Sequence, residues 1–197
     1  MKILELEQRS PEWFKARSGI PTASEFNTII TTDGKPSKQR QKYMYALVGE
    51  RLGGIVDESY QSFAMLQGIE KEKEARALYQ LIVEPVEEVG FCLSDCGRFG
   101  CSPDGLVGDN GAVEIKCPLI YTHVGYLIEN DLPADYYTQV QGQLLVTGRK
   151  WCDFVSYFPG LKPLIIRETP DEVFQKCLKK ELELFCNELD ELVKKLQ

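Results

Sequence analysis

This sequence of 197 residues has a single histidine, no cysteines in Cys-x-x-Cys spacing and no long apolar run. No apolar run approaches the ~20 residues that a transmembrane helix needs. The first residues, MKILELEQRS, lack the apolar segment of a signal peptide. We therefore expect a protein without a membrane-spanning segment that resides in the cytoplasm.

The seven cysteines form an odd number without tight spacing, which is typical of reduced thiols and argues against a disulfide framework. Cys92, Cys96, Cys101 and Cys117 lack the paired Cys-x-x-Cys spacing that would favour an iron–sulfur cluster. We expect Cys101 and Cys117 to fill the core. The single histidine, His123, is given no role, because a lone histidine is usually structural.

Acidic residues outnumber basic ones, and the formal net charge is -7. This excess argues against a protein that coats nucleic acid without regard to sequence. It is compatible with an enzyme that acts on phosphates, because catalytic carboxylates add negative charge that metal ions neutralise on binding.

The order of helical and strand patterns predicts one α/β domain over residues 1–197, with a central mixed β-sheet flanked by helices. Helical signals dominate residues 9–83. Short β-like runs separated by turn residues begin the core at residues 84–168, which also contains two helical segments. An amphipathic helix then covers residues 170–196. The chain is long enough for one sizeable core and too short to argue for two.

Local signals place several of these elements. Ser10, Pro11 and Glu12 predict the start of a helix that runs through Arg17, and Thr22-Ala23-Ser24-Glu25 predicts a capping box for a second helix. The segments WCDFVSYFP and PLIIRE predict a β-hairpin. Thr169-Pro170-Asp171-Glu172 predicts the start of the last helix. Its expected apolar stripe consists of Phe174, Leu178, Leu182, Phe185, Leu189 and Leu196.

The stretch from Cys101 to Cys117 carries the most informative chemistry. Side chains alternate along a strand, so Glu114 and Lys116 share one face. The glycines and polar residues between 105 and 111 favour a turn that places Asp104 beside Glu114. Two carboxylates beside one ammonium make a site for a hard divalent cation. A solvated hairpin with a surface ion pair is the alternative interpretation of these residues.

Several motifs in a fixed order make the sequence resemble the phage lambda-type exonucleases, the YqaJ-like viral recombinase family of the PD-(D/E)xK nuclease superfamily. The resemblance extends to about residue 158 and implies a restriction-endonuclease-like core. The motifs are Trp13…Arg17 with Thr22-Ala23-Ser24-Glu25, Gly68…Glu72 with Ala75-Arg76, Cys101-Ser102-Pro103-Asp104-Gly105, Glu114-Ile115-Lys116-Cys117-Pro118, and Gln139-Val140-Gln141.

The resemblance implies catalytic and metal-binding roles for a defined set of residues. Asp104 and Glu114 would bind Mg²⁺, with the backbone carbonyl of Ile115 as a further oxygen ligand. Glu72 would add a carboxylate, through water or to a second ion. Lys116 would hold and help deprotonate the attacking water. Mn²⁺ would substitute for Mg²⁺, and two ions are expected. Gln139 would orient the nucleophile or the lysine.

The resemblance also implies a site for a terminal 5′-phosphate. Arg17 would be its anchor, because a guanidinium fork matches phosphate oxygens. Ser24 and Ser102 would donate further hydrogen bonds. The lambda-type pattern includes a second phosphate-binding arginine shortly after the Lys-Cys-Pro segment, whereas the nearest positions here are Thr122 and His123. This departure leaves the strictness of phosphate selection open.

By resemblance, the chain is expected to be a Mg²⁺-dependent 5′→3′ exonuclease that degrades one strand of linear double-stranded DNA and leaves a 3′ overhang. A homotrimeric ring, a single-strand annealing partner, and a phage or prophage gene in a bacterial host are implied as well. A structure-specific or restriction-type endonuclease with the same core is one alternative. A non-catalytic DNA-binding module with a residual nuclease core is another, and the intact set of Asp104, Glu114 and Lys116 argues against it.

Overall fold

A computed structural model describes residues 1–54 and 63–197, with side chains outside residues 55–69. Gly68 of the second motif therefore lies outside the described side chains. The N-terminal half contains strand β1 (Lys2–Leu4), helix α1 (Pro11–Arg17), the 3₁₀ helix η1 (Ala23–Thr28), helix α2 (Arg40–Gly53) and helix α3 (Phe63–Ile82). Among the described residues, none of the helices has the length and apolar character to cross a membrane.

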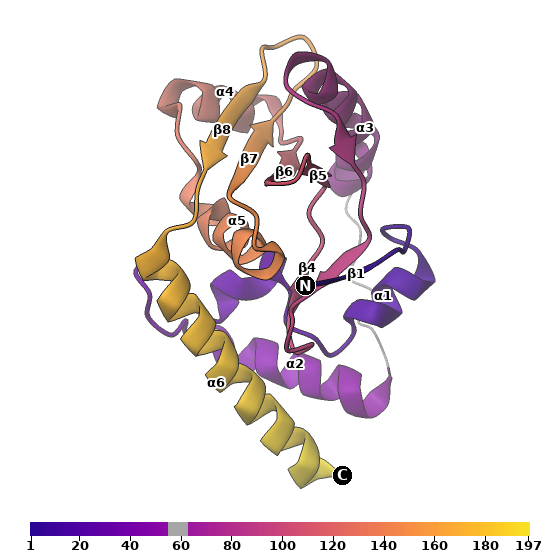
Figure 1. The fold of residues 1–197 in the computed structure, drawn as a ribbon, viewed down its shortest axis with the longest axis vertical. Coiled ribbons are helices and arrows are strands. Elements are labelled where there is room, and N and C mark those ends of the chain that lie inside the picture. The colour runs from indigo at the N-terminus through magenta and orange to yellow at the C-terminus, as the bar shows by residue number, and fades with distance from the viewer. Residues whose placement is uncertain (55–62) are drawn as a thin grey trace.

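The larger sheet is mixed and has five strands. It lies in the upper part of the view in Figure 1. Its order is β2 (Val86–Glu87), β5 (Gly105–Val107), β6 (Gly111–Lys116), β7 (Trp151–Ser156) and β8 (Leu164–Glu168). Strands β6 and β7 are parallel, and the other neighbours are antiparallel. The predicted α/β fold with a mixed sheet is confirmed, and so is the hairpin, which is β7 and β8.

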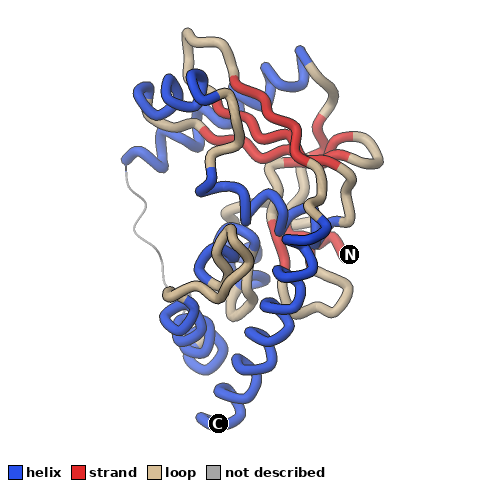
Figure 2. Tube along the Cα trace, turned by 90° about the vertical axis from the view of Figure 1, so that its left-hand side faces the viewer, coloured by secondary structure: helices blue, strands red, loops and turns tan. Residues whose placement is uncertain are grey.

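Two helices connect the parallel strands β6 and β7, because parallel neighbours need a crossover connection. They are α4 (Ile120–Glu129) and α5 (Ala134–Thr147). A second sheet of three strands joins β1 to β3 (Phe91–Leu93) and β4 (Gly100–Cys101). In the view of Figure 2, the five-stranded sheet lies in the upper half of the molecule and the C-terminal helix descends from it.

The C-terminal helix α6 (Glu172–Leu196) begins with an Asp171 cap, whose side chain accepts hydrogen bonds from the backbone N–H groups of Val173 and Phe174. Five of the six predicted stripe residues are buried. The expectation for Leu196 is wrong. This side chain is 63% exposed, because the last turn of the helix extends past the residues that cover the rest of the stripe.

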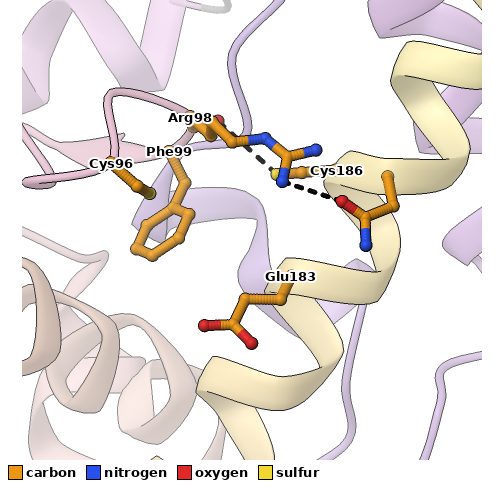
Figure 3. A pocket seen from close by; sticks show the side chains of 6 residues that line it. Cys96, Arg98, Phe99, Glu183 and Cys186 are labelled. Carbon is orange, nitrogen blue, oxygen red and sulfur yellow. Dashed lines mark hydrogen bonds between the residues drawn. The ribbon is translucent and has the colours of Figure 1, made fainter.

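A shallow cavity of about 290 Å³ marks the place where α6 meets the turn between β3 and β4 (Figure 3). The Arg98 guanidinium donates to the side chains of Asn187 and Asp190 at 2.8 and 2.7 Å. The Cys186 thiol donates to the backbone carbonyl of Arg98 at 3.6 Å. These contacts attach α6 to the small sheet. None of the predicted site residues lines this cavity.

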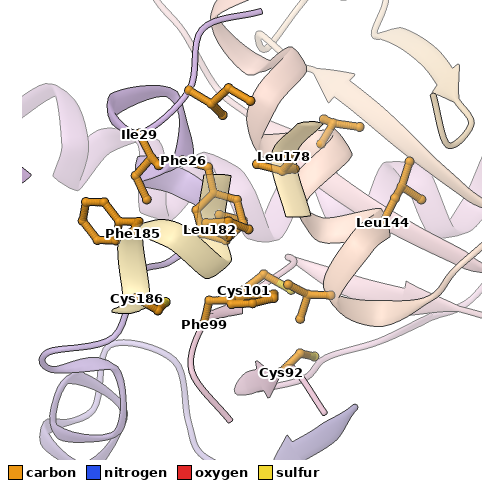
Figure 4. Packing of buried hydrophobic residues seen from close by; sticks show 14 of the residues in the cluster. Phe26, Ile29, Cys92, Phe99, Cys101, Leu144, Leu178, Leu182, Phe185 and Cys186 are labelled. Atoms are coloured by element: carbon orange, nitrogen blue, oxygen red, sulfur yellow. The ribbon is translucent and has the colours of Figure 1, made fainter. Parts of the chain in front are cut away.

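The larger of the two apolar clusters lies between α6, α5, η1 and the small sheet (Figure 4). Phe26, Leu144, Leu178, Leu182 and Phe185 are among its fully buried members. A second cluster packs Ala75 and Tyr79 of α3 against Val113 and Ile115 of β6. A fully buried Val, Leu, Ile or Phe side chain contributes about 1.5–3 kcal/mol to folding. The two clusters together fix α3, α5 and η1 around the central strand β6.

The capping box predicted at Thr22 is wrong. Residues 23–28 form a 3₁₀ helix, and the Thr22 side chain makes no capping hydrogen bond. Its hydroxyl instead accepts from the Arg17 guanidinium at 3.4 Å and lies 3.2 Å from the Ser24 hydroxyl. Contacts with Arg17 and Ser24 therefore engage the hydroxyl that a cap would use.

Candidate functional site

Strands β5 and β6 bring Asp104 beside Glu114. Gly105 pairs with Val113 in the antiparallel register, so the residue before Gly105 faces the residue after Val113. The backbone N–H of Asp104 donates to the Val113 carbonyl at 3.1 Å. One carboxylate oxygen of Asp104, Oδ2, accepts from the backbone N–H of Ile115 at 2.6 Å. The short connection between these strands thus places the two acids as their pattern predicts.

Three side chains surround the Glu114 carboxylate, which is only 2% exposed. Gln139 on α5 donates to Oε1 at 2.6 Å, and the Lys116 ammonium pairs with the same oxygen. Gln143, one turn further along α5, donates to Oε2 at 2.5 Å. No role for Gln143 follows from the sequence motifs. Its spacing of four residues from Gln139, on the same helix face, is the signal that could have identified it.

Electrostatics at this site couple the acids to the lysine. Burial, together with the Glu114 and Glu72 carboxylates, raises the pKa of Asp104 well above its ordinary value. Burial lowers the pKa of Lys116, but the Glu114 and Asp104 carboxylates outweigh burial and leave this pKa raised. Lys116 is therefore an ammonium ion while the carboxylates are free of cations. The Asp104 and Glu114 carboxylates repel each other when both are ionised, and a divalent cation would relieve this repulsion.

The donor set fits a hard divalent cation. The paired acids offer carboxylate oxygens, which Mg²⁺ and Mn²⁺ prefer. Asp104 Oδ1 receives no hydrogen bond from the described part of the chain, so it is available as a ligand. Among the described residues, however, no three acids, cysteines or histidines lie close enough together to hold a metal ion. Asp104 and Glu114 supply two acidic side chains, and the third predicted acid does not join them.

That third acid, Glu72 on α3, is held by two arginines. Arg9 donates to Oε2 at 2.6 Å, and Arg76 donates to Oε1 at 2.8 Å. Glu72 still acts on the site electrostatically, because its charge contributes to the raised pKa of Asp104. The structure therefore places Glu72 near the paired acids, with both of its oxygens engaged elsewhere.

The residues predicted to bind a 5′-phosphate lie together. The Arg17 guanidinium stacks over the Trp13 ring, with 3.9 Å between Cζ and the ring centroid. Its Nη1 donates to the Ser102 hydroxyl at 3.0 Å, and its Nη2 donates to Thr22. Thr22 in turn contacts the exposed Ser24 hydroxyl. Burial lowers the pKa of Arg17, yet a guanidinium stays charged at any physiological pH.

Two donors converge on the Ser102 hydroxyl oxygen. Trp13 Nε1 donates to it at 3.0 Å and also donates to the Gly90 carbonyl at 3.1 Å. Since Arg17 supplies the second donor, both lone pairs of the hydroxyl are occupied, and its own proton is free to be donated. Trp13 and Arg17 thereby orient Ser102 as a donor to an anion. Sequence motifs include Trp13 but assign it no such role.

The two positions where a second phosphate-binding arginine was expected hold other side chains. His123 is fully buried. Its Nδ1 lies 2.8 Å from the Ser156 hydroxyl, and its Nε2 lies 3.1 Å from the Lys162 carbonyl. Both ring nitrogens therefore serve the packing of α4 against β7 and the loop that follows it. Cys101 is also fully buried, whereas Cys117 is partly exposed.

Comparisons with known proteins place the chain among nucleases. A family model described as a YqaJ-like viral recombinase domain matches residues 12–150. The crystal structure of LHK-Exo, an alkaline exonuclease from Laribacter hongkongensis, is 37% identical with a TM-score of 0.87. The alignment covers 95% of this chain and 96% of that one. LHK-Exo in complex with dAMP matches equally well.

A more distant likeness concerns the fold alone. A phage-related exonuclease from Haemophilus somnus 129PT matches with 14% identity and a TM-score of 0.69, over 90% of this chain and 96% of that one. No curated protein sequence matches the chain.

Proposed function

The chain belongs to the YqaJ-like viral recombinase family and is a DNA exonuclease, and from this premise we propose its reaction in full. It degrades one strand of linear double-stranded DNA in the 5′→3′ direction and leaves a 3′ single-stranded overhang. The reaction depends on Mg²⁺, with Mn²⁺ as a substitute and two ions at work. The enzyme starts from a 5′-phosphorylated end.

One observation carries this proposal: Ser102, in the proposed phosphate site, and Asp104, one of the paired acids, lie in the same short segment. Ser102 and Asp104 are two residues apart, so their Cα atoms are separated by at most ~7 Å. Successive nucleotides of one DNA strand rise ~3.4 Å along the helix axis. A terminal phosphate held by Arg17 and Ser102 thus leaves a phosphodiester one or two nucleotides further along within reach of Asp104 and Glu114.

The contacts of these side chains support the following roles. Asp104, Glu114 and the Ile115 carbonyl would hold a divalent cation, which would supply Lewis-acid stabilisation of the phosphate. Lys116 holds the attacking water through its ammonium. Lys116 would take part in proton transfer once the Glu114 and Asp104 carboxylates, which keep its pKa raised, are neutralised. Gln139 shares Glu114 Oε1 with Lys116 and so fixes where the ammonium lies.

Arg17, Ser24 and Ser102 bind the terminal phosphate and thereby set the polarity of digestion. Glu72 supplies a carboxylate for the second ion. We further propose that three copies form a ring around the DNA. Enclosure keeps an acidic protein on its substrate without a strong positive field. The exposed strand then passes to a single-strand annealing protein, in a bacterial cell that carries the gene on a phage or prophage.

Digestion of a linear duplex labelled at one end tests activity, polarity and end dependence together. We expect digestion that needs Mg²⁺, begins at the 5′-phosphorylated strand and leaves covalently closed circular duplex intact. Lys116→Ala should lower the rate by about 10²-fold or more, as expected for a group that positions or deprotonates the nucleophile. Lys150→Ala, a change at an exposed lysine, is the matched control. Undiminished digestion by Lys116→Ala would rule out this mechanism, and cleavage of closed circles would favour an endonuclease.

A further inference from the structure

Arg9 has an unusual backbone conformation for its residue type. Its φ is 69°, in the left-handed region where a Cβ atom meets steric resistance. Asn130 is the other non-glycine residue in this region within the described chain. Asn130 caps the end of α4, a common use of the conformation. Arg9 lies in the turn just before α1, where the backbone N–H of Ser10 donates to the Glu7 carbonyl at 3.1 Å. A positive φ is usual at the third position of such a turn, so the turn fixes the backbone from which the Arg9 side chain extends.

The Arg9 side chain contacts Glu72, the acid that does not join the paired carboxylates. Arg9 occupies Oε2 of Glu72, and Arg76 occupies Oε1. All three residues line one cavity of about 510 Å³. The neighbouring Gln8 fixes the segment, because its side-chain amide donates to the carbonyls of Val89 and Pro103. Pro103 precedes Asp104, so Gln8 ties the segment that carries Arg9 to the residue before one of the paired acids.

Arg9 and Arg76 differ in how readily their ion pairs with Glu72 can break. Arg76 is on the same helix, four residues along, has a side chain that is 11% exposed, and also pairs with Glu88. The Arg9 side chain is 39% exposed and comes from a different segment. Arg9 is therefore the partner that can move into solvent at low cost. Its departure frees one carboxylate oxygen of an acid whose side chain is only 13% exposed.

We propose that Arg9 is a positioning residue that holds Glu72 away from Asp104 and Glu114 and releases it when a divalent cation binds. This inference rests on the proposed metal-dependent function. It explains why the described residues contain no preformed cluster of three ligands although three acids lie near one another. Arg9 then sets the affinity for the cation, because each binding event that recruits Glu72 must first break the contact with Arg9.

Binding of Mn²⁺ to the protein without DNA, measured by isothermal titration calorimetry, tests the proposal. Arg9→Gly keeps the backbone conformation and removes the guanidinium, so it should fold. We expect its dissociation constant for Mn²⁺ to fall about three- to fivefold, in line with the loss of a competing, partly exposed ion pair. Arg9→Lys should stay near wild type. Lys73→Ala, which removes another cation that lines the same cavity, is the matched control and should leave the constant unchanged.

A second measurement ties the effect to Glu72. In a Glu72→Gln background, the change caused by Arg9→Gly should disappear, because no carboxylate is left for the arginine to hold. A wild-type constant in Arg9→Gly overturns the proposal. A larger dissociation constant in Arg9→Gly overturns it too, since Arg9 would then present Glu72 to the cation. If wild-type protein digested DNA as well in EDTA as with Mg²⁺, the proposed metal-dependent function would be wrong. The calorimetric result would still report separately on Arg9 and Glu72.

Discussion

Replacing Arg17 with lysine separates charge from shape in the proposed 5′-phosphate site. The guanidinium makes three contacts at once: it stacks on Trp13 and donates to Ser102 and Thr22. A lysine keeps a positive charge but lacks the planar fork that reaches both hydroxyls while it faces a phosphate. Burial also works against the ammonium more than against a guanidinium, because lysine loses its proton readily when buried.

The size of the effect follows from the hydrogen bonds that are lost. A hydrogen bond to a charged group contributes about 1.5–3 kcal/mol. Arg17→Lys replaces a bidentate contact with a single one, so about one such bond to the phosphate disappears. At about 1.4 kcal/mol per factor of ten, kcat/KM for a 5′-phosphorylated end should fall roughly 10- to 150-fold. A 5′-hydroxyl end never made this contact, so its kcat/KM should change less than about twofold.

Two linear duplexes that differ only in their 5′ group provide the assay. The measured quantity is the ratio of the two kcat/KM values, which cancels any general loss of active protein. Arg17→Ala should reduce the ratio at least as far as Arg17→Lys does. An equal loss on both duplexes would mean that Arg17 only supports the fold. A wild-type ratio near one would remove the phosphate site from the proposed function altogether.

Two further changes test the electrostatics and the orientation of the site. Burial, Glu114 and Glu72 raise the pKa of Asp104 in the folded protein, so its ionisation destabilises the cation-free fold as the pH rises through that value. Asp104→Asn should therefore abolish digestion yet raise the Tm in EDTA at pH 8. The gain should be about 2–4 °C per kcal/mol of repulsion removed and should shrink toward pH ~4, and a lowered Tm would contradict the argument. Trp13→Phe keeps a ring under Arg17 but removes the donor to Ser102, so the preference for phosphorylated ends should fall about fivefold. Trp151→Phe, at a tryptophan that stacks on Arg167 elsewhere, should leave that preference unchanged.

Sequence patterns predicted the structure correctly where the contacting residues lie close together in the sequence. The turn between residues 105 and 111 predicts the pairing of β5 and β6, and the alternation along β6 places Glu114 and Lys116 on one face. The hairpin of β7 and β8 and most of the α6 stripe follow from the same kind of reasoning. These features depend on strand and helix periods, which the sequence states directly.

Sequence patterns failed where the packing of the folded chain decided which contacts a side chain makes. The Thr22 hydroxyl has the right position for a cap but contacts Arg17 instead. Leu196 fits the apolar stripe, yet it extends beyond the residues that could cover it. Gln143 has the spacing of a site residue, but only the packing of α5 against β6 shows that it reaches Glu114.

The sequence by itself therefore determined most of the helices, the hairpin that pairs Asp104 with Glu114, and the family to which the chain belongs. Tertiary structure alone decided which side chains meet across long separations. Arg17 reaches Ser102 across 85 residues, and Arg9 reaches Glu72 across 63. Such contacts depend on how helices pack on the sheets, and that packing is set by the whole core. The ion pair between Arg9 and Glu72 is one of the contacts that only the tertiary structure decided.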